Sequence, residues 1–169
     1  MQETTEQYVE RIHSLVGRDD PRTILASTAS RLRGLVEGRS RAQLAFKPSP
    51  ERWSVVEILA HLADAEVVGA WRIRSVLAGN GTALQPYDQD RWAATFRYAA
   101  SEPSVSLDLF QAARASTLSL LGRVDPALHD NFGMHGERGK ETVTEIARLY
   151  AGHDRNHLAQ VERLLAAQG

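Results

Sequence analysis

The stretch that does most to define the fold is residues 53–66, WSVVEILAHLADAE. Ser54 and Glu57 stand at the spacing of a capping box, in which each side chain bonds to the other residue's free backbone N–H. Trp53 and Ile58 occupy the two positions of a hydrophobic staple, which fixes the direction in which the chain enters a helix. These residues therefore predict the start of a helix at Ser54.

The apolar residues recur at helical spacing along most of the chain, which predicts an almost wholly helical protein. The helix that begins at Ser54 should run to about Ala78, because Gly79-Asn80-Gly81 follows it. A second capping box, Thr142 with Glu145, predicts the start of the last helix. The remaining helices are expected at about residues 3–16, 20–38 and 106–121, and the last helix should reach about residue 167.

Two segments separate the long helices. Residues 82–103 are too many for a simple turn between antiparallel neighbours, and we expect a crossover there with one short helix around residues 90–99. Residues 125–140 contain Pro126 and three glycines and are predicted to be a loop. The sequence thus predicts an all-α fold in one domain, residues 1–169. This is a four-helix bundle with a long crossover between the second and third bundle helices, plus an N-terminal helix.

Composition narrows the possible partners and compartments. Of the 169 residues, 20 are Lys or Arg and 21 are Asp or Glu, so no basic excess exists to neutralise nucleic-acid phosphates. Cysteine is absent, which excludes disulfides, thiolate metal ligands and a cysteine nucleophile. No apolar run approaches membrane-spanning length, and the first thirty residues contain no apolar signal segment. We expect a cytoplasmic protein that binds neither nucleic acid nor membranes.

The histidines carry the chemistry that can be read from this sequence. His153 and His157 lie four residues apart on the last predicted helix, so both imidazoles project from one face. This spacing allows two nitrogens to bind the same transition metal. Apolar neighbours such as Leu149 and Val161 lie beside the same stripe, which points the pair inward. Buried imidazoles without partners would cost a few kcal/mol, and a metal ion would satisfy them.

His61 is the best candidate for a third ligand, because it lies two turns into the helix that begins at Ser54 and faces inward. Asp64 lies one turn after it and Glu57 one turn before it. Either carboxylate could accept the second N–H of an imidazole and fix its tautomer. Asp64 could instead bind or deprotonate a substrate, and we take it as the candidate catalytic residue. Glu57 is more simply explained as a capping residue.

Each of these residues also has a purely structural explanation. A buried histidine is commonly a core residue with satisfied hydrogen bonds, and an HxxxH pair on a surface face is commonly solvated. His13, His129 and His135 have no partner at ligand spacing. We expect His129 and His135 to be exposed in the glycine-rich loop, although His135 could border the site.

Four segments in this order resemble the DinB-like (DinB/YfiT) superfamily of four-helix-bundle metalloproteins, and together they cover roughly residues 20–168. They are WSVVEILAHLADAE at 53–66, YDQDRW at 87–92, HGERG leading into TVTE at 135–145, and HDRNHLAQ at 153–160. The resemblance implies the long crossover and one divalent metal ion, zinc or nickel most often. Carried over residue by residue, the ligands are His61, His153 and His157.

The resemblance favours an enzyme without assigning its reaction, and we keep three expectations open. One expectation is a metal-dependent hydrolase that attacks a small-molecule substrate with a metal-activated water. Another is transfer of a low-molecular-weight thiol (bacillithiol, mycothiol or glutathione) to a small electrophile, in which the thiol must be a cosubstrate because the chain lacks cysteine. A third is a non-catalytic metal-binding or interaction protein. The resemblance also implies a homodimer.

Overall fold

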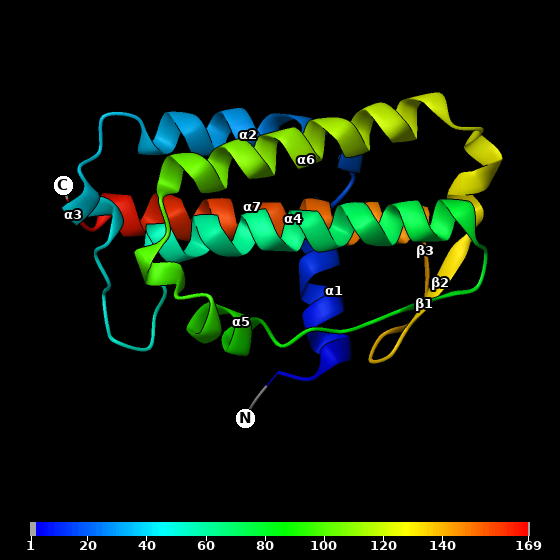
Figure 1. The fold of residues 1–169 in the computed structure, drawn as a ribbon, viewed down its shortest axis with the longest axis horizontal. Helices are drawn as coiled ribbons and strands as arrows, with labels where there is room; N and C mark the ends of the chain where they lie inside the picture. Colours follow the sequence, from blue (N-terminus) through cyan, green and yellow to red (C-terminus); the bar gives the residue numbers. More distant parts are fainter. Residues whose placement is uncertain (1–2, 169) are drawn as a thin grey trace.

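Four long helices packed side by side set the architecture of the protein. The computed structural model describes residues 3–168 (Figure 1). α4 and α6 run in one direction along the bundle, α2 and α7 run in the other, and α1 lies across them (Figure 1). The prediction of a four-helix bundle with an additional N-terminal helix is therefore confirmed. The bounds are α1 Thr5–Val16, α2 Pro21–Val36, α4 Val55–Ala78, α6 Pro103–Arg123 and α7 Val143–Ala166.

The predicted crossover joins α4 to α6 and returns along the length of the bundle, which makes these two helices parallel (Figure 1). It contains the strand β1 (Thr82–Leu84), the helix α5 (Gln89–Thr95) and the 3₁₀ helix η1 (Tyr98–Ala100). The single short helix expected around residues 90–99 is thus two pieces. They are separated at Arg97, whose φ of 56° lies in the left-handed region and interrupts the helix.

The segment at residues 125–140 is not the loop that its glycines predict. It forms the 3₁₀ helix η2 (Pro126–Asp130) and a hairpin of β2 (Phe132–His135) and β3 (Gly139–Thr142). β2 pairs in parallel with β1 of the crossover and antiparallel with β3. Strands of three or four residues are too short to produce a visible alternation of apolar and polar residues, which explains the error. The short helix α3 (Arg41–Leu44) also escaped prediction.

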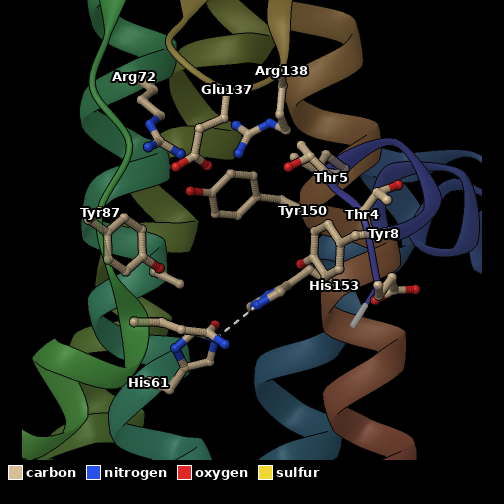
Figure 2. A pocket seen from close by; sticks show the side chains of 14 residues that line it. Thr4, Thr5, Tyr8, His61, Arg72, Tyr87, Glu137, Arg138, Tyr150 and His153 are labelled. Carbon is tan, nitrogen blue, oxygen red and sulfur yellow. Dashed lines mark hydrogen bonds between the residues drawn. The ribbon is translucent and has the colours of Figure 1, made fainter. Parts of the chain in front are cut away.

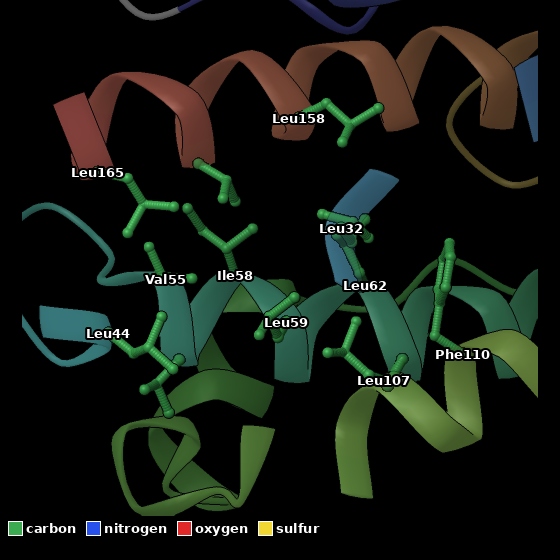
Figure 3. Packing of buried hydrophobic residues seen from close by; sticks show 13 residues of the cluster. Leu32, Leu44, Val55, Ile58, Leu59, Leu62, Leu107, Phe110, Leu158 and Leu165 are labelled. Atoms are coloured by element: carbon green, nitrogen blue, oxygen red, sulfur yellow. The ribbon is translucent and has the colours of Figure 1, made fainter. Parts of the chain in front are cut away.

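The main apolar core lies between the four bundle helices, and each helix contributes to it (Figure 3). Leu32 of α2, Ile58 and Leu62 of α4, Phe110 of α6 and Leu158 of α7 are at most 2% exposed. Burying a side chain of this size stabilises the fold by about 1.5–3 kcal/mol. Within residues 3–168, no helix is long and apolar enough to cross a membrane.

α1 approaches α7 unusually closely, at Gly152. A Cβ atom on Gly152 would lie 2.1 Å from the backbone oxygen of Ile12, so only glycine allows this crossing. The contact completely buries Ile12 and Val16 of α1. It also places the first turn of α1 beside His153, one residue after the crossing point.

Candidate metal centre

The start of α4 positions the first histidine of the site. The predicted capping box is present: Ser54 Oγ accepts from the backbone N–H of Glu57 at 3.3 Å, and Ser54 N–H donates to Glu57 Oε2 at 2.8 Å. His61 follows two turns later and is only 1% exposed. Its ring packs against Trp53, with 4.9 Å between the ring centroids. The helix start therefore holds His61 inside the bundle.

Three histidines meet between α4 and α7. His61 Nε2 lies 3.0 Å from His153 Nε2, which lies 3.1 Å from His157 Nε2. One potential ligand atom from each residue falls within 4.8 Å of the others. The structure thus brings together the three residues that the sequence singled out.

Burial keeps the three imidazoles neutral near pH 7. It lowers the pKa of His61 to about 3 and the pKa of His157 to about 4, and it lowers the pKa of His153 well below its usual value. In His61 and His153 the charge of a neighbouring histidine adds to this effect. Gln160 Oε1 accepts from His157 Nδ1–H at 2.9 Å, which leaves the Nε2 lone pair directed at the cluster.

The donor set fits a divalent transition metal. An imidazole nitrogen has one in-plane bonding direction, so His153 Nε2 can hydrogen-bond only one of its two neighbours. The other close N···N contact needs a third atom between the rings. With Zn–N bonds of about 2.0–2.1 Å, tetrahedral ligands lie roughly 3.3 Å apart. The observed separations of 3.0 and 3.1 Å are close to this value.

Two cavities reach the histidine cluster from different sides. The first, about 430 Å³, is lined by His61 and His153 together with Arg72, Tyr87 and Tyr150 (Figure 2). The second, about 720 Å³, is lined by His153 and His157 together with basic side chains that include Arg52 and Arg163. Small molecules therefore have space beside the cluster.

The family model of the DinB superfamily matches residues 24–161, a span that contains all three histidines. The chain belongs to the DinB superfamily. The resemblance based on the four sequence motifs is thereby confirmed.

Curated relatives of this DinB-superfamily chain are provisionally named metal-dependent hydrolases. A protein of Oceanobacillus iheyensis is 28% identical over 113 residues, and the match covers 66% of this chain and 64% of the relative. A protein of Geobacillus kaustophilus is 28% identical over 141 residues, covering 83% and 79%. YfiT of Bacillus subtilis is 26% identical over 148 residues, covering 86% and 83%.

The solved structure of Bacillus subtilis YfiT, described as an unusual four-helix bundle, superposes with a TM-score of 0.81 at 23% identity. The superposition covers 100% of this chain and 91% of that chain. This likeness supports the DinB fold derived above.

The carboxylates near His61 do not behave as one of our hypotheses expected. Asp64 accepts a 2.6 Å hydrogen bond from the hydroxyl of Tyr98, and Glu57 is held by the cap and by Lys47 Nζ at 3.0 Å. His61 Nδ1 is buried without a hydrogen-bond partner among residues 3–168. Neither carboxylate therefore fixes the tautomer of His61. Burial and the bond to Asp64 raise the pKa of Tyr98, which keeps its hydroxyl protonated as the donor.

The prediction that His135 is exposed is wrong. His135 lies on β2 and is 3% exposed, because the hairpin packs against the crossover through β1. Burial lowers the pKa of His135 to about 4, and its Nδ1 accepts from the backbone N–H of Glu137 at 3.2 Å. It is not among the residues that line either cavity. His129, on η2, is half-buried with Nδ1 3.0 Å from Arg22.

A buried ion cluster behind the histidines escaped the sequence reasoning. Arg114 of α6 bonds to Asp154 at 2.6 and 3.1 Å, to Glu66 at 2.7 Å and to the backbone oxygen of Leu25 at 3.0 Å. The cluster joins all four bundle helices and fixes α7 one residue after His153. The available signal was a charged residue at an inward position, Arg114, four residues after Phe110.

Proposed function

We propose that the chain is a divalent-metal-dependent hydrolase that acts on a small-molecule substrate. His61, His153 and His157 would hold one ion, zinc or nickel. The observation that carries the proposal is the convergence of three neutral Nε2 atoms, from buried His61 and His157 and half-buried His153, at 3.0 and 3.1 Å. The names of the curated relatives support it.

The protein's own contribution is to prepare the ligands and to shape the space around them. Burial holds the imidazoles unprotonated, Gln160 orients His157, and α1 covers the cluster at His153. Three protein ligands leave a coordination position open, as in catalytic sites. A divalent ion bound here supplies Lewis-acid catalysis, which activates water for attack on an ester or amide. The cavities beside the histidines favour an enzyme over a non-catalytic metal-binding protein.

Metal analysis tests the proposed ligands directly. Protein purified without a histidine tag should contain about one equivalent of zinc or nickel. His157→Ala should lose the ion and keep its helical circular dichroism, because His157 itself is not part of the main apolar core. His13→Ala removes a partly exposed histidine on α1 and is the matched control. Unchanged metal content in His157→Ala would overturn the assignment.

Activity measurements then separate two reactions. Hydrolysis of an ester and amide panel should disappear with a chelator and return with the ion. Thiol transfer is the second candidate, and the second cavity favours it through Arg52 and Arg163, which form no ion pair within the described part of the chain. Such cations suit the carboxylates of low-molecular-weight thiols. Activity that requires bacillithiol, mycothiol or glutathione would replace the hydrolase proposal.

Three further expectations remain proposals. A catalytic role for Asp64 is tested by Asp64→Asn, although its bond to Tyr98 also suits a positioning role. We propose a homodimer, which the 55% exposed Trp71 and 53% exposed Phe96 beside one surface depression support. Sedimentation of the purified protein checks the dimer. The cytoplasm remains the predicted compartment.

A further inference from the structure

Arg72 of α4 is a buried cation that lacks a counter-ion. The residue is only 3% exposed and lines the first cavity. One Nη donates to the backbone oxygen of Gln85 at 2.5 Å, but Nε is buried without a partner. Arg72 forms no ion pair with a carboxylate anywhere in residues 3–168. Buried charges in proteins are normally paired, so this guanidinium has unused capacity to bind an anion.

None of the other charged residues that line the cavity forms an ion pair with Arg72. Arg138 is neutralised by two contacts with Glu141, at 2.6 and 2.9 Å. The carboxylate of Glu3 is occupied by Arg11 at 2.8 Å. Glu137, the remaining carboxylate of the lining, is exposed and forms no ion pair among the described residues, and Figure 2 shows its side chain beside Arg72. Arg72 is therefore a buried positive charge without an ion pair, and an exposed carboxylate that solvent can hydrate lies near it.

Two tyrosine hydroxyls accompany Arg72. Tyr87 and Tyr150 line the same cavity, and neither hydroxyl has a hydrogen bond to another described residue. Burial raises the pKa of Tyr87 to about 12 and also raises the pKa of Tyr150, so both groups keep their protons as donors. Gly69 allows the Tyr150 ring to lie against α4, since a Cβ there would be 2.5 Å from ring atoms.

Arg72 and Tyr150 lie at the end of the cavity away from the histidines. Figure 2 shows Tyr87 on the side wall between Arg72 and His61, with His61 and His153 at the other end. Arg72 follows His61 by three turns on the same face of α4, about 16 Å along the axis, and its side chain leans back towards the helix start. A molecule that reaches both ends must carry its anionic group several bonds away from its reacting group.

We infer that this end of the cavity is a carboxylate-binding subsite, in which Arg72, Tyr87 and Tyr150 hold the carboxylate of a small monoanionic substrate. The planar guanidinium matches the two oxygens of a carboxylate. A phosphate dianion would call for more than one unpaired cation. The catalytic meaning of the subsite rests on the proposed function, whereas carboxylate binding itself does not require the metal.

Nuclear magnetic resonance of metal-free protein tests the subsite. The ¹⁵Nε–H signal of Arg72 is assigned by its loss in Arg72→Lys and followed during titration with N-acetylglycine. The uncharged N-acetylglycinamide and inorganic phosphate are titrated in parallel. We expect a saturable shift with the carboxylate and none with the amide. An unmoved signal, an equal response to the amide, or preferential binding of phosphate would overturn the proposal.

Variants test whether the carboxylate binds specifically at Arg72 or responds only to the positive charge of the protein. Arg72→Met should weaken N-acetylglycine binding about tenfold or more, as expected for loss of a charged hydrogen bond. Arg91→Met removes an exposed positive charge on α5, outside this cavity, and should leave binding unchanged. If Arg72→Met does not fold, Tyr150→Phe gives an independent measure, with an expected weakening of about three- to tenfold. Equal affinity in Tyr150→Phe and wild-type protein would contradict the subsite.

The metal content of the same samples separates the two proposals. A saturable Arg72 shift in protein that never binds zinc or nickel would support the subsite and refute the metal-dependent function. Stoichiometric metal binding without any Arg72 shift would refute the subsite and leave the metal-dependent function standing.

Discussion

Replacing Gly152 by alanine should loosen α1 from the bundle. The new Cβ would lie 2.1 Å from the backbone oxygen of Ile12 and 2.8 Å from its carbonyl carbon and Cγ2. A backbone carbonyl cannot rotate away as a side chain can. Restoring an ordinary contact of about 3.4 Å requires α1 to move by about 1.3 Å relative to α7.

The expected loss of stability depends on how much of the packing of α1 against α7 this movement disrupts. Overpacking of a close contact typically costs about 1–3 kcal/mol. Complete detachment of α1 would expose Ile12 and Val16, each now fully buried, and would cost about 3–6 kcal/mol in total. The higher helix propensity of alanine offsets about 1 kcal/mol of this destabilisation. We therefore expect Gly152→Ala to lower the free energy of unfolding by up to about 2 kcal/mol if α1 only shifts, and by about 2–5 kcal/mol if α1 detaches.

Urea denaturation followed by circular dichroism measures this change. Gly34→Ala is the matched control, because Gly34 is an exposed glycine of α2 and a Cβ added there would have no neighbouring atom within 4 Å. That substitution should stabilise the protein by about 0.5–1 kcal/mol. If Gly152→Ala proved as stable as Gly34→Ala, the explanation of the α1–α7 crossing would be wrong.

Three other perturbations should have defined outcomes. Because the pKa values of His61 (about 3) and His157 (about 4) lie below 6.5, the unfolded chain binds more protons in acid. The stability of metal-free protein should therefore stay constant above pH 6.5 and fall below it by about 1.4 kcal/mol per pH unit for each histidine. If the free energy of unfolding in urea did not change between pH 7.5 and pH 5, the burial of these histidines would be contradicted. Arg114→Met leaves two buried carboxylates unpaired and should destabilise by about 3–5 kcal/mol in urea denaturation, which an unchanged midpoint would disprove. Gly69→Ala should displace the Tyr150 ring and alter its near-ultraviolet circular dichroism, and an identical spectrum would argue against the close contact.

The bundle and the histidine cluster could be predicted because their signals are local. Capping boxes mark the starts of α4 and α7, and helical periodicity then determines which side chains face inward. His61 lies two turns from one cap and His153 lies three turns from the other. The convergence of these histidines thus followed from two well-marked helices that must pack together.

The features that escaped prediction depend on residues distant in the chain. Asp64 meets Tyr98 only because the crossover returns along α4, and the spacing of neighbouring residues carries no information about that contact. The two carboxylates that bind Arg114 belong to residues 40 and 48 positions away in the sequence. The burial of His135 likewise requires β1, which arrives from the crossover. Contacts between residues so far apart in the sequence become visible only in the three-dimensional structure.

The histidine cluster also sets an order of events during synthesis. His61 and His153 are separated by 92 positions, so at about 5–20 residues per second the ribosome adds His153 roughly 5–18 seconds after His61. No nascent chain can assemble the three nitrogens before the final helix is made. The main apolar core contains none of the three histidines, so its packing does not depend on the proposed ion.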